Sequence, residues 1–155
     1  MLQKRVYFIQ QFGAPLGYSF GWYVHGPYSP ELARDGFEIE NVSKIVNRDW
    51  TRYVHELPEI GKEVPVDTMA RFFESVRRAA EGLAVPESTF MEVISSLHFV
   101  RENWFQQDDD FSESARELSR VKVGLSDPPM EEAVQKSRQM LLAFLPRASR
   151  TDTGK

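Results

Sequence analysis

The chain has 155 residues, the length of one ordinary domain, and its 41% hydrophobic residues suffice for a core. It has no cysteine, which excludes disulfides, thiolate metal sites and cysteine nucleophiles. A net charge of −4 makes the whole protein repel phosphate backbones, so nucleic-acid binding needs a local basic patch. No apolar run is long enough to cross a bilayer and no signal peptide is recognisable, which predicts a cytoplasmic protein without membrane contact.

The first element expected is a helix that begins almost at Met1. Its apolar residues recur at helical spacing, and the expected inner face comprises Leu2, Val6, Ile9 and Phe12, widened by Tyr7 and Phe8. Gly13 and Pro15 supply the stop. Because no N-cap residue precedes this helix, we expect a frayed start or a natural N-terminus upstream of Met1.

An extended segment and a rigid turn follow. Residues 20–24, Phe-Gly-Trp-Tyr-Val, are aromatic and β-branched, and Gly26-Pro27 comes directly after them. This pattern predicts a short strand that runs into a turn. Ser29 then caps a helix whose first residue is Pro30, where the missing N–H does no harm.

The helix that begins at Pro30 is expected to run to about Glu38, with an interruption or end near Gly36. Residues 40–64 follow no convincing single period. We therefore expect broken structure between the second helix and the third.

Two long helices are expected next. Asp67 is the expected N-cap of the first, which closes near Gly82, and Pro86 fits the first turn of the second. Their core stripes comprise Met69, Phe72, Phe73, Val76, Ala80 and Leu83 in the first, and Phe90, Val93, Ile94, Leu97, Val100 and Trp104 in the second.

Two further helices complete the pattern. Asp110 and Glu113 have the spacing of a capping box before a short helix, and Asp127-Pro128 opens the last helix, which Pro146 ends. The inward positions of that last helix are Met130, Val134, Leu141 and Phe144. Taken together, the patterns predict one mainly α domain over residues 1–146, with about six helices and a short β-strand or hairpin, and a flexible tail over 147–155. A winged-helix-like arrangement is one option for this set of elements.

No catalytic constellation is recognisable in the string. The three histidines, His25, His55 and His98, lie in no catalytic motif; His98 is expected in or beside the core, and His55 in an ordinary surface role. The run Asp108 to Asp110 lacks the spacing of a calcium loop, so we interpret it as a structural loop that caps a helix. Glycine-rich phosphate loops are absent as well. The prediction is a protein that is not an enzyme and holds no cofactor or metal.

The segment from Tyr23 to Pro30 is the strongest candidate for a binding site. Glycine and proline fix its backbone, and Tyr23, His25 and Tyr28 place polar tips near the N-terminus of the following helix. Two hypotheses stay open for this corner. It receives a carboxylate or phosphate from a partner, or it only turns the chain and packs aromatic rings.

Three strings in the first 35 residues resemble a known group. They read Gln-Lys-Arg-Val-Tyr-Phe-Ile-Gln at 3–10, Pro-Leu-Gly-Tyr-Ser-Phe-Gly-Trp-Tyr at 15–23 and His-Gly-Pro-Tyr-Ser-Pro-Glu-Leu at 25–32. They are similar to the YwgA-like prokaryotic proteins and, more distantly, to the SocA-like (Panacea) antitoxin domain. The resemblance implies a mainly helical domain without known enzymatic activity, and in the antitoxin branch it implies direct protein binding. The matching residues carry over as fold or interface positions only: Lys4, Tyr7, Tyr23, Gly26, Pro27 and Tyr28.

Two classes of function follow. The first is a protein-interaction module, such as an antitoxin or an accessory subunit of a prokaryotic defence locus, that binds through the first helix and the Gly-Pro turn. Self-association into a homo-oligomer is an open option for this class. The second is a winged-helix-like regulator whose Arg71, Arg77 and Arg78 contact nucleic-acid phosphates.

Overall fold

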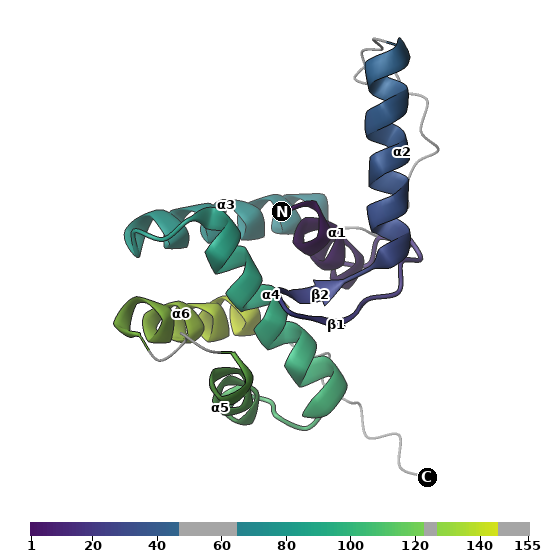
Figure 1. Ribbon diagram of the computed structural model, residues 1–155. Coiled ribbons are helices and arrows are strands. Elements are labelled where there is room, and N and C mark those ends of the chain that lie inside the picture. The colour runs from purple at the N-terminus through teal and green to yellow at the C-terminus, as the bar shows by residue number, and fades with distance from the viewer. Residues whose placement is uncertain (47–64, 123–126, 146–155) are drawn as a thin grey trace.

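The computed structural model describes residues 1–46, 65–122 and 127–145, which form a mainly helical domain with one small hairpin (Figure 1). The elements in chain order are α1 (Leu2–Gln11), β1 (Gly21–Tyr23), β2 (Gly26–Tyr28), α2 (Pro30–Val46), α3 (Val66–Gly82), α4 (Glu87–Trp104), α5 (Ser112–Val121) and α6 (Pro128–Phe144). The two strands pair antiparallel. The predicted fold class is confirmed.

Helix α4 is the centre of the domain. It contacts α3, α5 and α6, and also α1 and β2. Every residue from Val93 to Arg101 is buried, as expected for a helix covered on all sides. The predicted stripe of α4 is confirmed from Phe90 to Val100. Trp104 is 44% exposed, and its ring packs against the ring of Trp22.

The buried face of α1 is narrower than the one predicted. Tyr7, Phe8 and Phe12 are buried, whereas Leu2 is 54% exposed. The ring of Phe8 packs on Phe72 of α3, which directs the 7–8–12 face inward. The face that includes Leu2 lies instead beside α2.

The Gly26-Pro27 turn is also different from its prediction, because it forms a second strand. Trp22 pairs with Pro27 in the middle of the hairpin, with Gly21 opposite Tyr28 and Tyr23 opposite Gly26. The sequence placed the turn at Gly26-Pro27, whereas the turn residues are Val24 and His25, and the hairpin that was one predicted option forms. Here Pro27 occupies an edge strand, where that donor is not needed.

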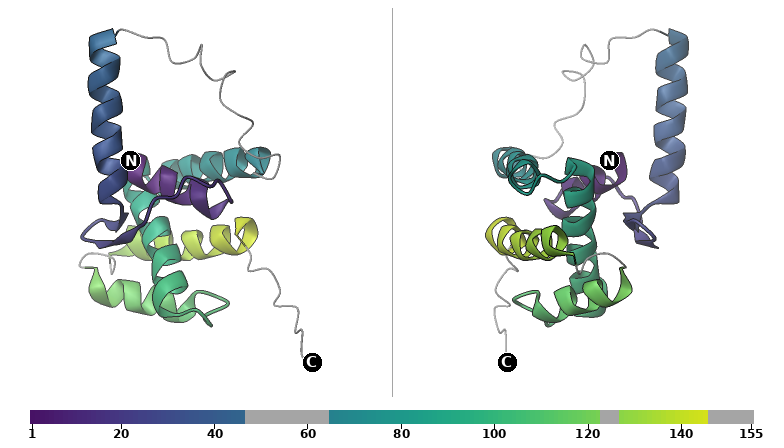
Figure 2. Two further views of the ribbon diagram at one scale, coloured as in Figure 1. Left: turned by 90° about the vertical axis from the view of Figure 1, so that its right-hand side faces the viewer. Right: turned by 60° about the vertical axis from the view of Figure 1, so that its left-hand side comes forward.

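Helix α2 is longer than predicted. It begins at Pro30 as expected but passes Gly36 and Glu38 and continues to Val46, so residues 40–46 are helical rather than broken. Figure 2 shows the C-terminal part of α2 standing away from the other helices. Gly36 lies inside the helix, at the point where α2 passes α1. A Cβ there would come 3.2 Å from the side chain of Leu2, so glycine allows this close approach and is not a stop.

Two helix starts differ in detail from their predictions. The N-cap of α3 is Pro65, and Asp67 lies inside its first turn, where its charge suits the helix dipole. The N-cap of α5 is Phe111, in the left-handed conformation at φ 61°, so the expected capping box does not form. Instead the guanidinium of Arg101 lies 4.3 Å from the centre of the Phe111 ring and holds this turn against α4.

Some predictions fall outside the described residues: the structure of residues 47–64, the place of His55, the stop at Pro146 and the flexibility of 147–155. Among the helices that the structure describes, none combines the length and apolar character needed to cross a membrane.

Candidate functional site

The hairpin presents a pair of tyrosines at the surface, of which Tyr23 is exposed and Tyr28 is half-buried. The rings of Tyr23 and Tyr28 stack with their centres 5.2 Å apart and their planes 30° apart. Tyr23 is 57% exposed and Val24, at the tip, is 73% exposed. We call Tyr23, Val24, His25 and Tyr28 the tyrosine patch. Its aromatic area with polar tips is typical of surfaces that bind other proteins.

Two glutamines of α1 fasten the segment that carries this patch. Gln3 donates to the carbonyl of Ser29 at 3.0 Å and accepts from its N–H at 2.9 Å. Gln10 makes the same pair of bonds with the backbone of Tyr18, at 3.0 and 2.9 Å. The two glutamines are seven residues apart and therefore lie on one side of the helix. Both ends of the hairpin are thus held by hydrogen bonds that do not depend on charge.

The base of the hairpin fits closely against α4. Gly26 adopts φ 88°, and a Cβ at this position would lie 2.4 Å from Oγ of Ser96. Gly26 and Pro27 are both buried. Lys4 of α1 donates to the carbonyl of Pro27 at 3.1 Å. Burial lowers the pKa of Lys4, while nearby Glu92 opposes the shift and Lys122 adds to it.

His25 leaves the turn toward α4 rather than toward the start of α2. Its Nδ1 lies 3.3 Å from a carboxylate oxygen of Glu92, and the imidazole is 73% exposed. The other oxygen of Glu92 accepts from Lys122, whose side chain is 11% exposed. The ammonium of Lys122 also lies 6.0 Å from the Trp22 ring centre. One carboxylate therefore stands among cationic groups at the foot of the patch.

The first turn of α2 receives its hydrogen bonds from side chains of its own segment. Oγ of Ser29 accepts from the N–H of Leu32 at 3.3 Å, which confirms Ser29 as the cap. The same hydroxyl donates to Glu31 at 2.8 Å, and this bond lowers the pKa of Glu31. The first turn thus already has a cap, Ser29, and a carboxylate of its own, Glu31, at the position where the sequence suggested that an anion of a partner binds.

Tyr7 and His98 lie beneath the patch and do not belong to its surface. The Tyr7 hydroxyl and Nδ1 of His98 share a hydrogen bond of 2.8 Å, and the two residues are only 3% and 4% exposed. Burial, with a smaller contribution from Arg101, lowers the pKa of His98 to about 3. His98 is therefore a neutral core residue, as predicted. Of the expected interaction residues, Tyr7, Gly26 and Pro27 support the hairpin and Lys4 fastens it. Tyr23 and His25 are exposed, and Tyr28 is half-buried.

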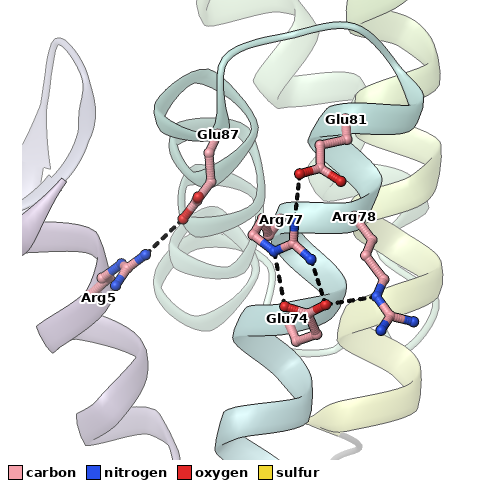
Figure 3. A network of polar contacts seen from close by, with 6 residues as sticks. All are labelled: Arg5, Glu74, Arg77, Arg78, Glu81 and Glu87. Atoms are coloured by element: carbon pink, nitrogen blue, oxygen red, sulfur yellow. Dashed lines mark hydrogen bonds and ion pairs between the residues drawn. The ribbon is translucent and has the colours of Figure 1, made fainter.

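The arginines of the nucleic-acid hypothesis lie on α3, where Figure 3 shows Arg77 and Arg78 among carboxylates. Glu74 accepts from Arg77 and from Arg78, each at 2.7 Å, and Glu81 also accepts from Arg77. The two arginine bonds lower the pKa of Glu74 to about 2. Arg71 donates to Thr68 at 3.3 Å. Two of the three expected phosphate contacts thus already share a carboxylate.

Two grooves flank α6, and the part of the chain that the structure describes places no histidine in either. The groove between α3 and α6 has a volume of about 500 Å³ and an apolar floor that includes Leu83 and Met140. The groove between α5 and α6, of about 570 Å³, is lined by Arg116 and Arg138 among others.

Among the described residues, no three His, Asp or Glu side chains gather closely enough to hold a metal ion. Asp108 instead caps α5, by accepting from the N–H and the hydroxyl of Ser114, both at 2.6 Å.

Sequence reasoning missed Gln3, Gln10, Ser96 and Glu92. A seven-residue spacing of glutamines on a helix carries no specific signal, because the partners are backbone atoms of a distant segment. No family model, curated protein or solved structure matches this chain.

Proposed function

We propose that this protein is a non-enzymatic interaction module that binds a protein partner through the tyrosine patch. The observation that carries the proposal is the stacked pair of the exposed Tyr23 and the half-buried Tyr28, on a hairpin fastened at both ends and at its base. A surface that is ordered before binding loses little conformational entropy when the complex forms. Tyrosine side chains placed in this way are the type that anchors protein interfaces.

The resemblance to the YwgA-like and SocA-like proteins supports a class of partner. We propose a cytoplasmic toxin or another component of a prokaryotic defence locus, which the module neutralises or assists. The His25–Glu92 pair at the foot of the patch adds a polar group that can select a partner by hydrogen bonding.

The test is purification from native cells, followed by calorimetry with the partner recovered in stoichiometric amount. Tyr23→Ala and Tyr28→Ala should each weaken binding by ten-fold or more, since aromatic anchors near an interface centre contribute about 2 kcal/mol or more. His25→Ala should have a smaller effect, because the exposed imidazole is a rim contact.

Leu142→Ala is the matched control. Leu142 is 44% exposed on α6, away from the hairpin, so binding should be unchanged. If the folded Tyr23 and Tyr28 variants bind as tightly as the wild type, or if no stoichiometric partner is recovered, the proposal fails.

A further inference from the structure

The register of the hairpin defines which backbone groups point away from it. In an antiparallel pair, opposite residues alternate between pairs that exchange hydrogen bonds and pairs that do not. Pro27 has no N–H, so the Trp22–Pro27 pair must be of the second kind. The N–H and C=O of Trp22 therefore point outward from the free edge of β1, and the carbonyl of Pro27 points outward from β2.

The two edges are treated differently. On the β2 edge, Pro27 removes the donor and Lys4 occupies the acceptor, at 3.1 Å. Proline and lysine are the residues with which proteins block sheet edges against further pairing. On the β1 edge, neither the N–H nor the C=O of Trp22 has a hydrogen-bond partner among the described residues. This edge offers one donor and one acceptor on a single residue, flanked by the exposed Gly21 and Tyr23.

We propose that the β1 edge pairs antiparallel with the β1 edge of a second copy of this chain. A two-fold axis through Trp22 lets the two Trp22 residues exchange both hydrogen bonds, so that neither outward group stays unpaired. The product is a four-stranded sheet whose outer edges are both blocked by Pro27 and Lys4, which stops the assembly at two chains. This inference goes beyond the proposed function and does not rest on it.

The side chains beside Trp22 fit this occupant. In the paired sheet Gly21 lies directly opposite Tyr23 of the other copy, in a close, non-hydrogen-bonded pair. Gly21 has no left-handed φ, and a Cβ there would meet nothing within 4 Å, so its own chain does not require glycine. An aromatic ring that lies over a glycine of a neighbouring strand is a favourable cross-strand arrangement. The same match occurs twice about the two-fold axis.

The first experiment measures mass by light scattering and sedimentation, up to about 0.5 mM protein because short interfaces are weak. The wild type should form dimers. In the double variant Gly21→Lys/Tyr23→Lys, two lysines oppose each other twice across the interface, whereas Gly21→Glu/Tyr23→Lys places glutamate opposite lysine. The Glu/Lys variant should dimerise about ten-fold more tightly than the Lys/Lys variant, with equal helix content by circular dichroism.

The second experiment follows amide exchange by NMR at increasing protein concentration. The Trp22 amide should become protected as dimers form, while the Gly21 and Tyr23 amides, which bond within the hairpin, stay protected throughout. A wild type that is monomeric at every concentration overturns the proposal and leaves the edge to an extended segment of another protein. A dimer in which the Trp22 amide gains no protection, or in which the two double variants behave alike, overturns it as well.

Discussion

The hairpin and the exposed face of α3 both carry polar networks, but the two networks differ in kind. The hairpin is fastened by neutral side chains to backbone atoms far away in sequence, as in the two bonds between Gln3 and Ser29. On α3, Arg77 and Arg78 pair with Glu74 and Glu81 within three or four residues on one exposed helix face. The first network connects α1 with the hairpin segment, whereas the second lies entirely within α3.

This difference predicts where substitutions matter. A buried backbone group that loses its partner pays the full desolvation cost, whereas an exposed ion pair returns its charges to water. We therefore expect the stability of the domain to depend on the base and ends of the hairpin, and hardly on the arginines of α3.

The largest effect is expected from Gly26→Ala. The new Cβ meets Oγ of Ser96 at 2.4 Å and the residue must keep φ 88°, so unfolding free energy should fall by about 2–4 kcal/mol in urea denaturation. Adding Ser96→Gly should restore the part that is due to contact. Gly21→Ala is the control and should change stability by less than about 0.5 kcal/mol. Equal effects at the two glycines would contradict the close fit of the hairpin base.

A smaller loss is expected from Gln3→Ala. The variant leaves the N–H of the buried Ser29 without a partner, whereas its carbonyl still accepts from the N–H of Ala33 at 3.1 Å, and it should cost about 1–3 kcal/mol in the same assay. Gln11→Ala, on the exposed side of α1, is the matched control and should be nearly neutral. If both glutamine variants were neutral, the fastening of the hairpin by α1 would be refuted.

The His98 imidazole under the hairpin should make stability depend on pH. Its pKa is lowered to about 3 in the folded protein, so below the unfolded value near 6.5 the unfolded chain binds a proton that the native state does not. The stabilisation is complete above pH 6.5 and is lost as the pH falls toward 3. Relative to pH 7, the loss at pH 5 should be about 2 kcal/mol. Urea denaturation across this range should show the slope in the wild type and in His25→Ala, and a slope reduced by one proton in His98→Leu.

The smallest effect is expected from Glu74→Gln. Its carboxylate is exposed and shares two arginines, so the denaturation midpoint should shift less than in Gln3→Ala. The same variant sharpens the nucleic-acid hypothesis, because it removes the carboxylate partner of Arg78 and leaves Arg77 paired with Glu81 alone. Binding of duplex DNA at about 50 mM salt that falls steeply with added salt would support that hypothesis, and its absence in both wild type and variant would exclude it.

Helical periodicity was sufficient to predict most of the helices. Phe72 and Val76 of α3, and Val134 and Leu141 of α6, are buried where the 3.6-residue pattern placed them. For α1 the pattern predicted too wide an inner face, because apolar residues lie around much of the helix and only the packing of Phe8 on Phe72 selects the part that is buried. It also ended α2 too early, because a glycine inside a helix looks like a stop unless the neighbouring Leu2 is known.

The candidate site was predicted only in its location. The sequence indicated Tyr23, His25 and Tyr28 as the residues of the corner, but it placed their tips around the start of α2, whereas His25 lies against Glu92 of α4. Contacts between residues some 70 positions apart leave no local pattern in one sequence, so the orientation of the corner could not be derived from it.

The sequence by itself determined the order and approximate positions of the helices, the N-cap positions Ser29 and Asp127, and the aromatic character of the hairpin. These features depend on spacing and on residues within a few positions of each other. The tertiary structure alone decided that Pro27 lies in a strand, that Gln3 and Gln10 fasten the hairpin and that one edge of it stays open. Those features depend on which backbone atoms of distant segments come within hydrogen-bond distance, and the packing of α1 and the hairpin on α4 sets that distance.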